Sequence, residues 1–296
     1  MKIKVAIQSM RAPFLILPPV CVFLGASTVI ASKSQFSMSL LALALVGAIL
    51  AHISVNTLNE YFDFKSGLDM ITMKTPFSGG SGALPQNPEM AGTVLAIGAV
   101  SLILTVLIGV FFIWEYGAGI VPLGLAGAIL ILTYTGWINK HPFLCLIAPG
   151  MGFGFLMVVG TQYVLQGEYL SLSWVLAAVP FFLVNNLLLL NQYPDIQADA
   201  SVGRRHFPIA YGVNRSNLVY GLFALAATVI IVVCIALNQL PLSSLIALLP
   251  MPLAIFSLTG AIRHGAKIGN FPQYLAANVI VTILTPALLG ISISIG

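Results

Sequence analysis

The residues best suited to chemistry are the four aspartates, the only ones in the chain, which fall in two pairs far apart in the sequence. Asp63 and Asp69 form the first pair, and Asp195 and Asp199 form the second. Carboxylates that share a small volume repel one another, and each resists ionisation. Mg²⁺ relieves such repulsion and characteristically combines one or two carboxylates with substrate phosphates. The two pairs therefore predict a magnesium site for a diphosphate substrate.

The first pair continues an apolar segment that is long enough to be a helix. If that helix extends through the pair, Asn59 and Asp63 lie one turn apart on the same face. Asp69 follows Gly67 and is too far round the helix to share this face. We therefore expect Asp69 to sit past the helix end, on a segment that folds back toward Asp63.

The second pair repeats this spacing. Asp195 and Asp199 are four residues apart, so on a helix they share one face. Asn191 precedes Asp195 by four residues, as Asn59 precedes Asp63. This repetition hints at an internal duplication.

Cationic side chains stand close to both pairs in the sequence. Arg offers phosphate a two-point contact and Lys a point charge, so Lys65, Lys74, Arg204 and Arg205 are the candidates to bind the diphosphate. The topology rule for membrane proteins also accounts for each of them singly. The glycine-rich run Ser78–Gly82 lacks the ending of a phosphate-binding P-loop and is interpreted as a turn or a lid. The histidines, among them His52, His141 and His206, lack metal-ligand spacing and are interpreted as packing or interfacial residues.

The elements that position these residues are predicted to be transmembrane helices. Apolar residues make up 59% of the chain and charged residues only 7%, against about 25% charged in soluble domains. The apolar residues form runs long enough to cross a bilayer as helices. We predict an all-α, polytopic membrane protein, with residues 1–296 as one domain and nine transmembrane helices around a central cavity. The predicted spans are 12–32, 37–58, 91–113, 117–138, 142–165, 172–192, 217–238, 242–262 and 273–295.

The basic residues predict the orientation of these spans. With nine spans and the N-terminus in the cytoplasm, eleven of the twelve Lys and Arg residues lie on the cytoplasmic side, and only Lys33 lies opposite. Both aspartate pairs then fall in, or lead into, the two long cytoplasmic connections. We expect a multi-pass protein of a bacterial or archaeal-type cell membrane. The weak basic excess of +4 does not indicate nucleic-acid binding.

At the two pairs the sequence resembles the UbiA superfamily of intramembrane prenyltransferases. That superfamily is marked by Asn-x-x-x-Asp with a further Asp downstream, and by a second Asp-x-x-x-Asp motif. The six-residue step from Asp63 to Asp69, and the stretch from Asp199 to Arg205, resemble the menaquinone-type branch. That branch attaches a polyprenyl chain to 1,4-dihydroxy-2-naphthoate. Two positions depart from the pattern: Glu60 replaces a common Asp, and Phe143–Pro149 lacks an acidic residue of that branch.

The resemblance implies a mechanism for these residues. Mg²⁺ binds the diphosphate of an isoprenoid donor, an allylic cation forms in a helix-lined chamber, and an aromatic ring carbon attacks it. Aromatic faces near the motifs, such as that of Tyr193, would stabilise the cation. The implied catalytic residues are Asp63, Asp69, Asp195 and Asp199, and the implied metal ligands are Asn59, Asp63, Asp195 and Asp199. The implied substrate-binding residues are Asn59, Lys65, Lys74, Asn191, Tyr193, Arg204 and Arg205.

Other functions stay open on the sequence alone. The aromatic acceptor is expected to be 1,4-dihydroxy-2-naphthoate, with 4-hydroxybenzoate, homogentisate and a chlorophyllide as alternatives. Carboxylates in a membrane protein also mark the ion pathways of cation-coupled transporters. Such transporters carry their acidic groups near the midplane, on broken helices in matched halves, whereas these aspartates lie near one face. A catalytically silent relative that serves as a binding subunit is the third alternative.

Overall fold

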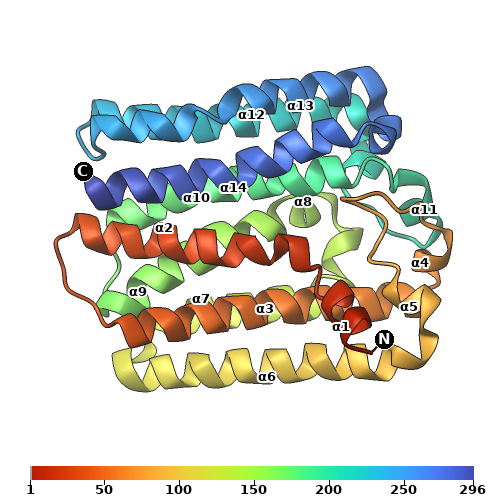
Figure 1. The fold of residues 1–296 in the computed structure, drawn as a ribbon, viewed down its shortest axis with the longest axis horizontal. Coiled ribbons are helices and arrows are strands. Elements are labelled where there is room, and N and C mark those ends of the chain that lie inside the picture. Colours follow the sequence, from red (N-terminus) through yellow and green to blue (C-terminus); the bar gives the residue numbers. More distant parts are fainter. Residues whose placement is uncertain (1) are drawn as a thin grey trace.

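The computed structural model describes residues 2–296 as a bundle of long helices that run roughly side by side, with the two ends of the chain at opposite ends of the bundle (Figure 1). Every regular element among these residues is helical. The elements are α1 (Lys2–Ser9), η1 (Ala12–Ile16), α2 (Leu17–Ala31), α3 (Met38–Lys65), α4 (Leu68–Ile71), α5 (Ala83–Gln86), η2 (Pro88–Met90), α6 (Ala91–Tyr116), η3 (Ala118–Ile120), α7 (Val121–Thr133), η4 (Ile138–Lys140), α8 (Pro142–Gly150), η5 (Met151–Val159), α9 (Gly160–Gln166), α10 (Ser171–Asn191), α11 (Ile196–Ser201), α12 (Phe207–Ala236), η6 (Leu242–Leu248), α13 (Met251–His264), η7 (Gly265–Asn270) and α14 (Pro272–Ile295).

Eight helical segments within residues 2–296 are long and apolar enough to cross a membrane, and these eight agree with predicted spans. The predicted span 117–138 does not reach this length, because its apolar helix covers only Ala118–Thr133. Eight of the nine predicted spans are therefore found among the described residues. The all-α, polytopic fold class is confirmed.

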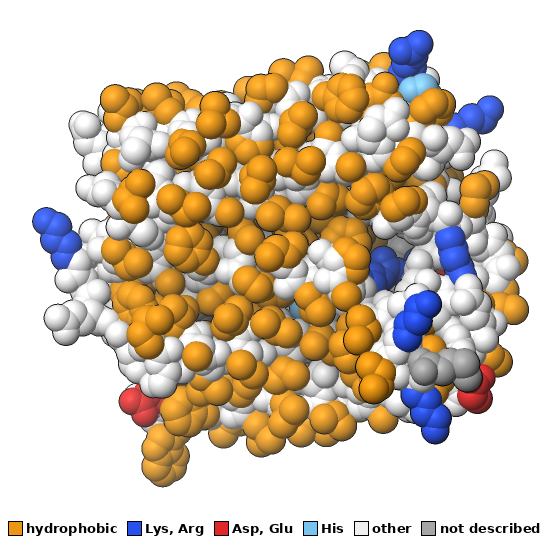
Figure 2. Space-filling view, in the orientation of Figure 1, with side chains coloured by type: hydrophobic (Ala, Val, Ile, Leu, Met, Phe, Trp, Pro, Cys, Tyr) orange, Lys and Arg blue, Asp and Glu red, His pale blue; other side chains and the backbone are white. Residues whose placement is uncertain are grey.

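The helices are packed unevenly. The main hydrophobic core is built from α2, the α8–η5 segment, α10, α12, α13 and α14. By contrast, α3 and α6 bury few side chains, and α7 buries none. Leu, Ile, Val and Phe side chains cover the outside of the bundle, as expected for a surface in contact with lipid. Figure 2 shows these apolar side chains along the helices and most of the visible Lys and Arg side chains at the end that carries the N-terminus.

Two helix breaks shape the inside of the bundle. Pro149 lies within α8, where its ring removes a backbone N–H from the helical ladder. The wider π-helical turns of η5 follow at once, and such turns are common at functional sites. The Gly150 N–H donates to the Asn185 side chain of α10 at 2.6 Å. The second break is at Gly212 in α12, where φ is +80°.

The start of α12 corrects the predicted boundary. The sequence places the seventh span at 217–238, whereas α12 begins at Phe207. Pro208 suits the first turn of a helix, because its missing N–H has no partner there in any case. The polar residues that follow, including Asn214 and Arg215, made this stretch resemble a loop.

Candidate active site

The two aspartate pairs line one cavity of about 650 Å³. It is bordered by α2, α3, α6, α7, α10 and the helix from α8 to α9, and it contains all four aspartates together with Asn59 and Asn191. The polar residues occupy the end of the bundle that carries α4 and α11, and the rest of the wall is mostly apolar. Segments more than a hundred residues apart in the chain thus contribute carboxylates to a single hollow, as the motifs predicted.

The first pair has the predicted local geometry. α3 continues as helix to Lys65, and Asn59 Nδ2 donates to Asp63 Oδ2 at 2.7 Å across one turn. Thr135 Oγ1 donates to the side-chain Oδ1 of Asn59 at 3.1 Å, which fixes the orientation of this amide. Gly67 adopts φ +81° and ends the helix, so that Asp69 folds back on the short helix α4. Both carboxylates are buried.

The second pair lies on α11 and at its start. Asp195 immediately precedes α11, and the Asp199 N–H donates to the Asp195 main-chain carbonyl at 2.8 Å, which confirms the expected single turn. Asp195 Oδ2 accepts the Gly79 N–H at 3.1 Å. Asp199 Oδ2 lies 3.0 Å from Nε2 of the buried His206. The glycine-rich run therefore contacts the second pair directly.

Gly80 in the same run packs closely against the first pair. A Cβ on Gly80 would come within 2.5 Å of Asp69 Oδ1, and the residue has φ +71°. Only glycine combines this backbone conformation with so close an approach. The Ser78–Gly82 segment thus forms a cradle that touches Asp69 on one side and Asp195 on the other.

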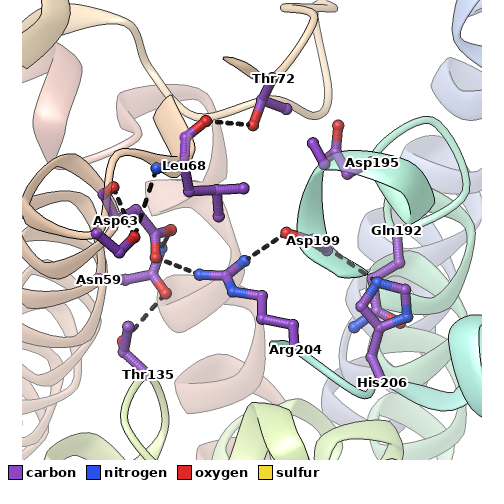
Figure 3. A network of polar contacts seen from close by, with 12 residues as sticks. Asn59, Asp63, Leu68, Thr72, Thr135, Gln192, Asp195, Asp199, Arg204 and His206 are labelled. Atoms are coloured by element: carbon purple, nitrogen blue, oxygen red, sulfur yellow. Dashed lines mark hydrogen bonds and ion pairs between the residues drawn. The ribbon is translucent and has the colours of Figure 1, made fainter. Parts of the chain in front are cut away.

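Arg204 joins the two pairs (Figure 3). Its guanidinium donates to Asp63 Oδ1 through one nitrogen and to Asp199 Oδ1 at 3.0 Å through another. The three side chains are only 17%, 7% and 6% exposed, respectively. Burial alone would lower the pKa of Arg204, but the adjacent carboxylates of Asp63 and Asp199 outweigh it and raise that pKa further above its usual value. Arg204 therefore links the two pairs through one member of each and offsets part of their negative charge.

Several oxygen atoms in this wall accept no hydrogen bond from any of residues 2–296. They are Asp69 Oδ2, Asn139 Oδ1, Asn191 Oδ1 and Asp195 Oδ1, all buried and all on residues that line the cavity. Burial and neighbouring carboxylates raise the pKa of Asp69 and that of Asp195 to about 7. The site thus has a surplus of oxygen acceptors, and a hard cation with oxygen ligands fits this donor set.

The carboxylates are not gathered into a ready-made metal cluster. Within residues 2–296, no group of three His, Cys, Asp or Glu side chains stands close enough to hold a metal ion. The Arg204 guanidinium lies between Asp63 and Asp199, one carboxylate from each pair. Two of the predicted metal ligands, Asp63 and Asp199, each have one carboxylate oxygen bound to Arg204. Asp195 has one oxygen, Oδ1, that accepts no hydrogen bond from the described residues.

Four predicted substrate-binding residues do not line the cavity. Lys65 and Lys74 are exposed, and the Lys65 ammonium lies 5.8 Å from the centre of the Tyr61 ring. Arg205 is also exposed, because the chain turns so that Arg204 alone points inward. Tyr193 is fully buried in the core, where its hydroxyl donates to Asn217 Oδ1 at 2.8 Å. Its ring packs against neighbouring helices, so its predicted contact with substrate is not supported.

Sequence reasoning missed other polar residues of the wall. Arg11 lies at the left-handed break between α1 and η1, and it lines the cavity. His52 and Asn56 continue the polar stripe of α3 above Asn59. The spacing of Asn56 and Asn59, three residues apart on α3, was a usable signal for Asn56. No such signal was present for Arg11, because the topology rule for membrane proteins already accounts for a basic residue at that position.

Comparison with known proteins agrees with this geometry. The UbiA prenyltransferase family matches residues 17–271. A 1,4-dihydroxy-2-naphthoate octaprenyltransferase of Bacillus subtilis is 29% identical over 178 residues, which span 58% of this chain and 55% of that relative. The Haemophilus influenzae protein of the same name is 24% identical over 85% of this chain and 83% of its own length.

Solved structures share the fold. A UbiA homologue from Aeropyrum pernix superposes with a TM-score of 0.69 at 16% identity, covering 96% of this chain and 98% of the other. A UbiA homologue from Archaeoglobus fulgidus, solved with DMAPP and Mg²⁺, gives 0.68 at 14% identity and covers 98% of both chains. The paired aspartates of a multi-pass membrane helix bundle and the family match lead to one conclusion: the chain belongs to the UbiA family of prenyltransferases.

Proposed function

We propose that the protein catalyses the Mg²⁺-dependent transfer of a polyprenyl group from an isoprenoid diphosphate to 1,4-dihydroxy-2-naphthoate. The observation that carries the proposal is the meeting of two aspartate pairs, from α3–α4 and from α11, at the polar end of one apolar cavity. The relatives named for this naphthoate acceptor support the choice of aromatic substrate. The prenyl donors and the metal in the homologous structures support the other half of the reaction.

The magnesium ligands in this proposal are Asn59, Asp63, Asp195 and Asp199. The free oxygen of Asp195 and the engaged oxygens of Asp63 and Asp199 supply anionic ligands, and Asp69 adds a further free carboxylate oxygen. When bound, Mg²⁺ would neutralise the diphosphate and make it a better leaving group. Asn59 is already held in place by its hydrogen bonds to Asp63 and Thr135.

The cationic side chains of the wall complete the diphosphate site. Arg204 and Arg11 line the cavity, and a guanidinium can contact phosphate oxygens at two points. With Mg²⁺ bound to the carboxylates, Arg204 would be free to contact the diphosphate. Asn191 lines the same end, where its free amide oxygen contributes to the polar wall. The apolar remainder of the cavity holds the prenyl chain and excludes water from the reacting carbon.

The identity of the aromatic acceptor is the most specific element of this proposal. The segment Phe143–Pro149 has no acidic residue to contact the ring, so the acceptor must be held by other side chains. The alternatives 4-hydroxybenzoate, homogentisate and a chlorophyllide differ in ring size and polar groups, and a direct assay separates them.

We further propose the topology and extent of the functional unit. The basic residues favour a cytoplasmic N-terminus and a site that opens to the cytoplasm of a bacterial or archaeal-type cell. Residues 1–296 act as a single domain, because one cavity receives side chains from segments between Arg11 and His206.

The test uses purified full-length protein with geranyl diphosphate, Mg²⁺ and each of the four acceptors. We expect diphosphate release and a prenylated naphthoate, identified by mass spectrometry, and we expect EDTA, Asp63→Asn or Asp195→Asn to stop both. Glu115→Gln is the matched control, because this exposed carboxylate lies at the other end of α6. A different prenylated acceptor would revise the acceptor, and cation flux in proteoliposomes without diphosphate release would refute the proposal.

A further inference from the structure

His52 forms part of the cavity wall in the apolar region beyond the aspartates. It lies on α3 with Asn56, Asn59 and Asp63, and the spacing of four, three and four residues places all of them on one face of the helix. His52 is 6% exposed, and all four residues line the cavity. The next cavity-lining residue along α3 is Ala51, followed by other small residues. His52 is therefore the deepest polar side chain of this stripe.

Hydrogen bonds determine which ring nitrogen of His52 carries a proton. Asn56 Nδ2 donates to the Met10 carbonyl at 3.2 Å, which fixes the orientation of this amide because a carbonyl only accepts. The same nitrogen lies 2.9 Å from His52 Nε2. Since an amide nitrogen only donates, Nε2 accepts, and the neutral ring carries its proton on Nδ1. His52 thus has an Nδ1–H donor.

That donor has no hydrogen-bond partner among residues 2–296. Nδ1 is buried and makes no hydrogen bond, whereas buried donors are almost always paired. The ring is held edge-on against Phe153 at 5.2 Å between centroids, so packing fixes its place in the wall. An unpaired donor in the wall of a substrate cavity indicates that a ligand oxygen completes it.

The position of the donor selects the ligand. His52 precedes Asn59 by seven residues, which is about 10 Å along a helix that rises 1.5 Å per residue. The diphosphate is held at the level of Asn59 and Asp63, and the prenyl chain has no oxygen. The acceptor must reach the prenyl carbon next to the diphosphate, so it would lie on the apolar side of Asn59, where His52 lines the same cavity, and a hydroxyl at the side of its ring would be the oxygen available to Nδ1.

We propose that His52 donates a hydrogen bond from Nδ1 to a phenolic oxygen of the aromatic acceptor. Asn56 is a positioning residue that keeps the proton on Nδ1. This inference rests on the proposed function, and it assigns the selection of hydroxylated rings to His52. The bond orients the ring and leaves the covalent chemistry at the aspartate end.

Two substitutions separate the donor from the bulk of the ring. In His52→Asn, the side-chain amide can place an N–H near the position of Nδ1. His52→Gln instead reaches toward the position of Nε2 and loses the Nδ1 donor. We expect His52→Gln to raise the KM for 1,4-dihydroxy-2-naphthoate about tenfold, in line with the loss of one hydrogen bond. The KM for geranyl diphosphate should stay within twofold of the wild-type value. In His52→Asn, the KM for the acceptor should return close to the wild-type value.

Further measurements make the result specific. Asn56→Asp, which favours a proton on Nε2, raises the acceptor KM as His52→Gln does. His141→Gln is the matched control, since this exposed histidine does not line the cavity. Solid-state NMR of protein with ¹⁵N-labelled histidine, with His52→Gln used to assign the signal, reports the protonated nitrogen directly. We expect the Nδ1–H form for His52.

The outcomes are distinguishable from failure of the proposed function. If wild-type protein prenylates none of the four acceptors, the proposed function fails first. If it prenylates the naphthoate and His52→Gln leaves the acceptor KM unchanged, or raises only the KM for geranyl diphosphate, the inference is overturned. A protonated Nε2 in the NMR spectrum overturns it independently of any activity.

Discussion

Replacement of Arg204 by Gln tests whether this side chain takes the place of the metal in the free protein. Arg204 bridges Asp63 and Asp199 in the interior, with little solvent contact for any of the three. Loss of one partner of a buried ion pair costs about 3–5 kcal/mol, because the other charge is left without compensation. Arg204 is 17% exposed, so solvent screens part of this cost, and we expect a loss of about 2–3 kcal/mol in the metal-free protein.

The response to Mg²⁺ should then move in the opposite direction. In wild-type protein the metal must displace the guanidinium, whereas in Arg204→Gln it meets free carboxylates. We expect Mg²⁺ alone to raise the melting temperature more in the variant, and its apparent Kd to fall about tenfold, the equivalent of about 1.4 kcal/mol. With geranyl diphosphate present the order reverses, since the variant lacks a phosphate contact.

The assay is thermal unfolding of detergent-solubilised protein, followed during titration with Mg²⁺ and then with Mg²⁺ and geranyl diphosphate. Arg205→Gln is the matched control, because the exposed Arg205 side chain makes no ion pair among residues 2–296. Its melting temperature and its Mg²⁺ response should equal those of wild type. Weaker Mg²⁺ binding by Arg204→Gln in the absence of diphosphate would refute the reasoning.

Three further predictions concern the carboxylates and the glycine cradle. Asp195→Asn should lower kcat at least about 100-fold, measured as diphosphate release, because it removes charge stabilisation at the leaving group; activity within threefold of wild type would contradict this. Burial raises the pKa of Asp69 and of Asp195 from 3.8 to about 7, so the metal-free protein should gain melting temperature as pH falls from 8 to 5 and lose it as pH rises through 7. Mg²⁺ should raise the melting temperature at pH 8 to its value at low pH. A melting temperature that falls as the pH is lowered would show instead that these carboxylates are ionised and paired in the metal-free protein. Gly80→Ala brings a Cβ within 2.5 Å of Asp69, whereas Gly67 has a similar positive φ and open space around it. Gly80→Ala should therefore lose more activity and more stability than Gly67→Ala. Equal losses in the two variants would argue against a cradle.

The sequence was sufficient to predict the local structure of both motifs. The four-residue spacing of Asn59 and Asp63 required only that α3 continue past the apolar run, and the Asn59–Asp63 hydrogen bond shows that it does. Gly67 identified the helix end, because glycine readily adopts the positive φ found there. These features depend on neighbours within about one helical turn, which a sequence displays directly.

Contacts between distant segments were not predictable in this way. Four cations near the motifs looked equivalent in sequence, yet only Arg204 reaches Asp63, 141 residues away. Lys65, two residues after Asp63 on α3, is exposed and does not line the cavity. The shortness of α7 was hidden because apolar residues continue beyond Thr133, where the helix has already ended.

The absence of any buried residue in α7 has a consequence for the size of the substrate. This helix separates the cavity from lipid with a wall one helix thick, and glycines and alanines make part of that wall. Displacement of α7 would break little apolar packing, so hydrocarbon can pass between the chamber and the bilayer at small energetic cost. Under the proposed function, a chamber bounded on one side by so lightly packed a helix would not limit the length of the prenyl chain. The donor that the cell supplies would then set the number of isoprene units transferred.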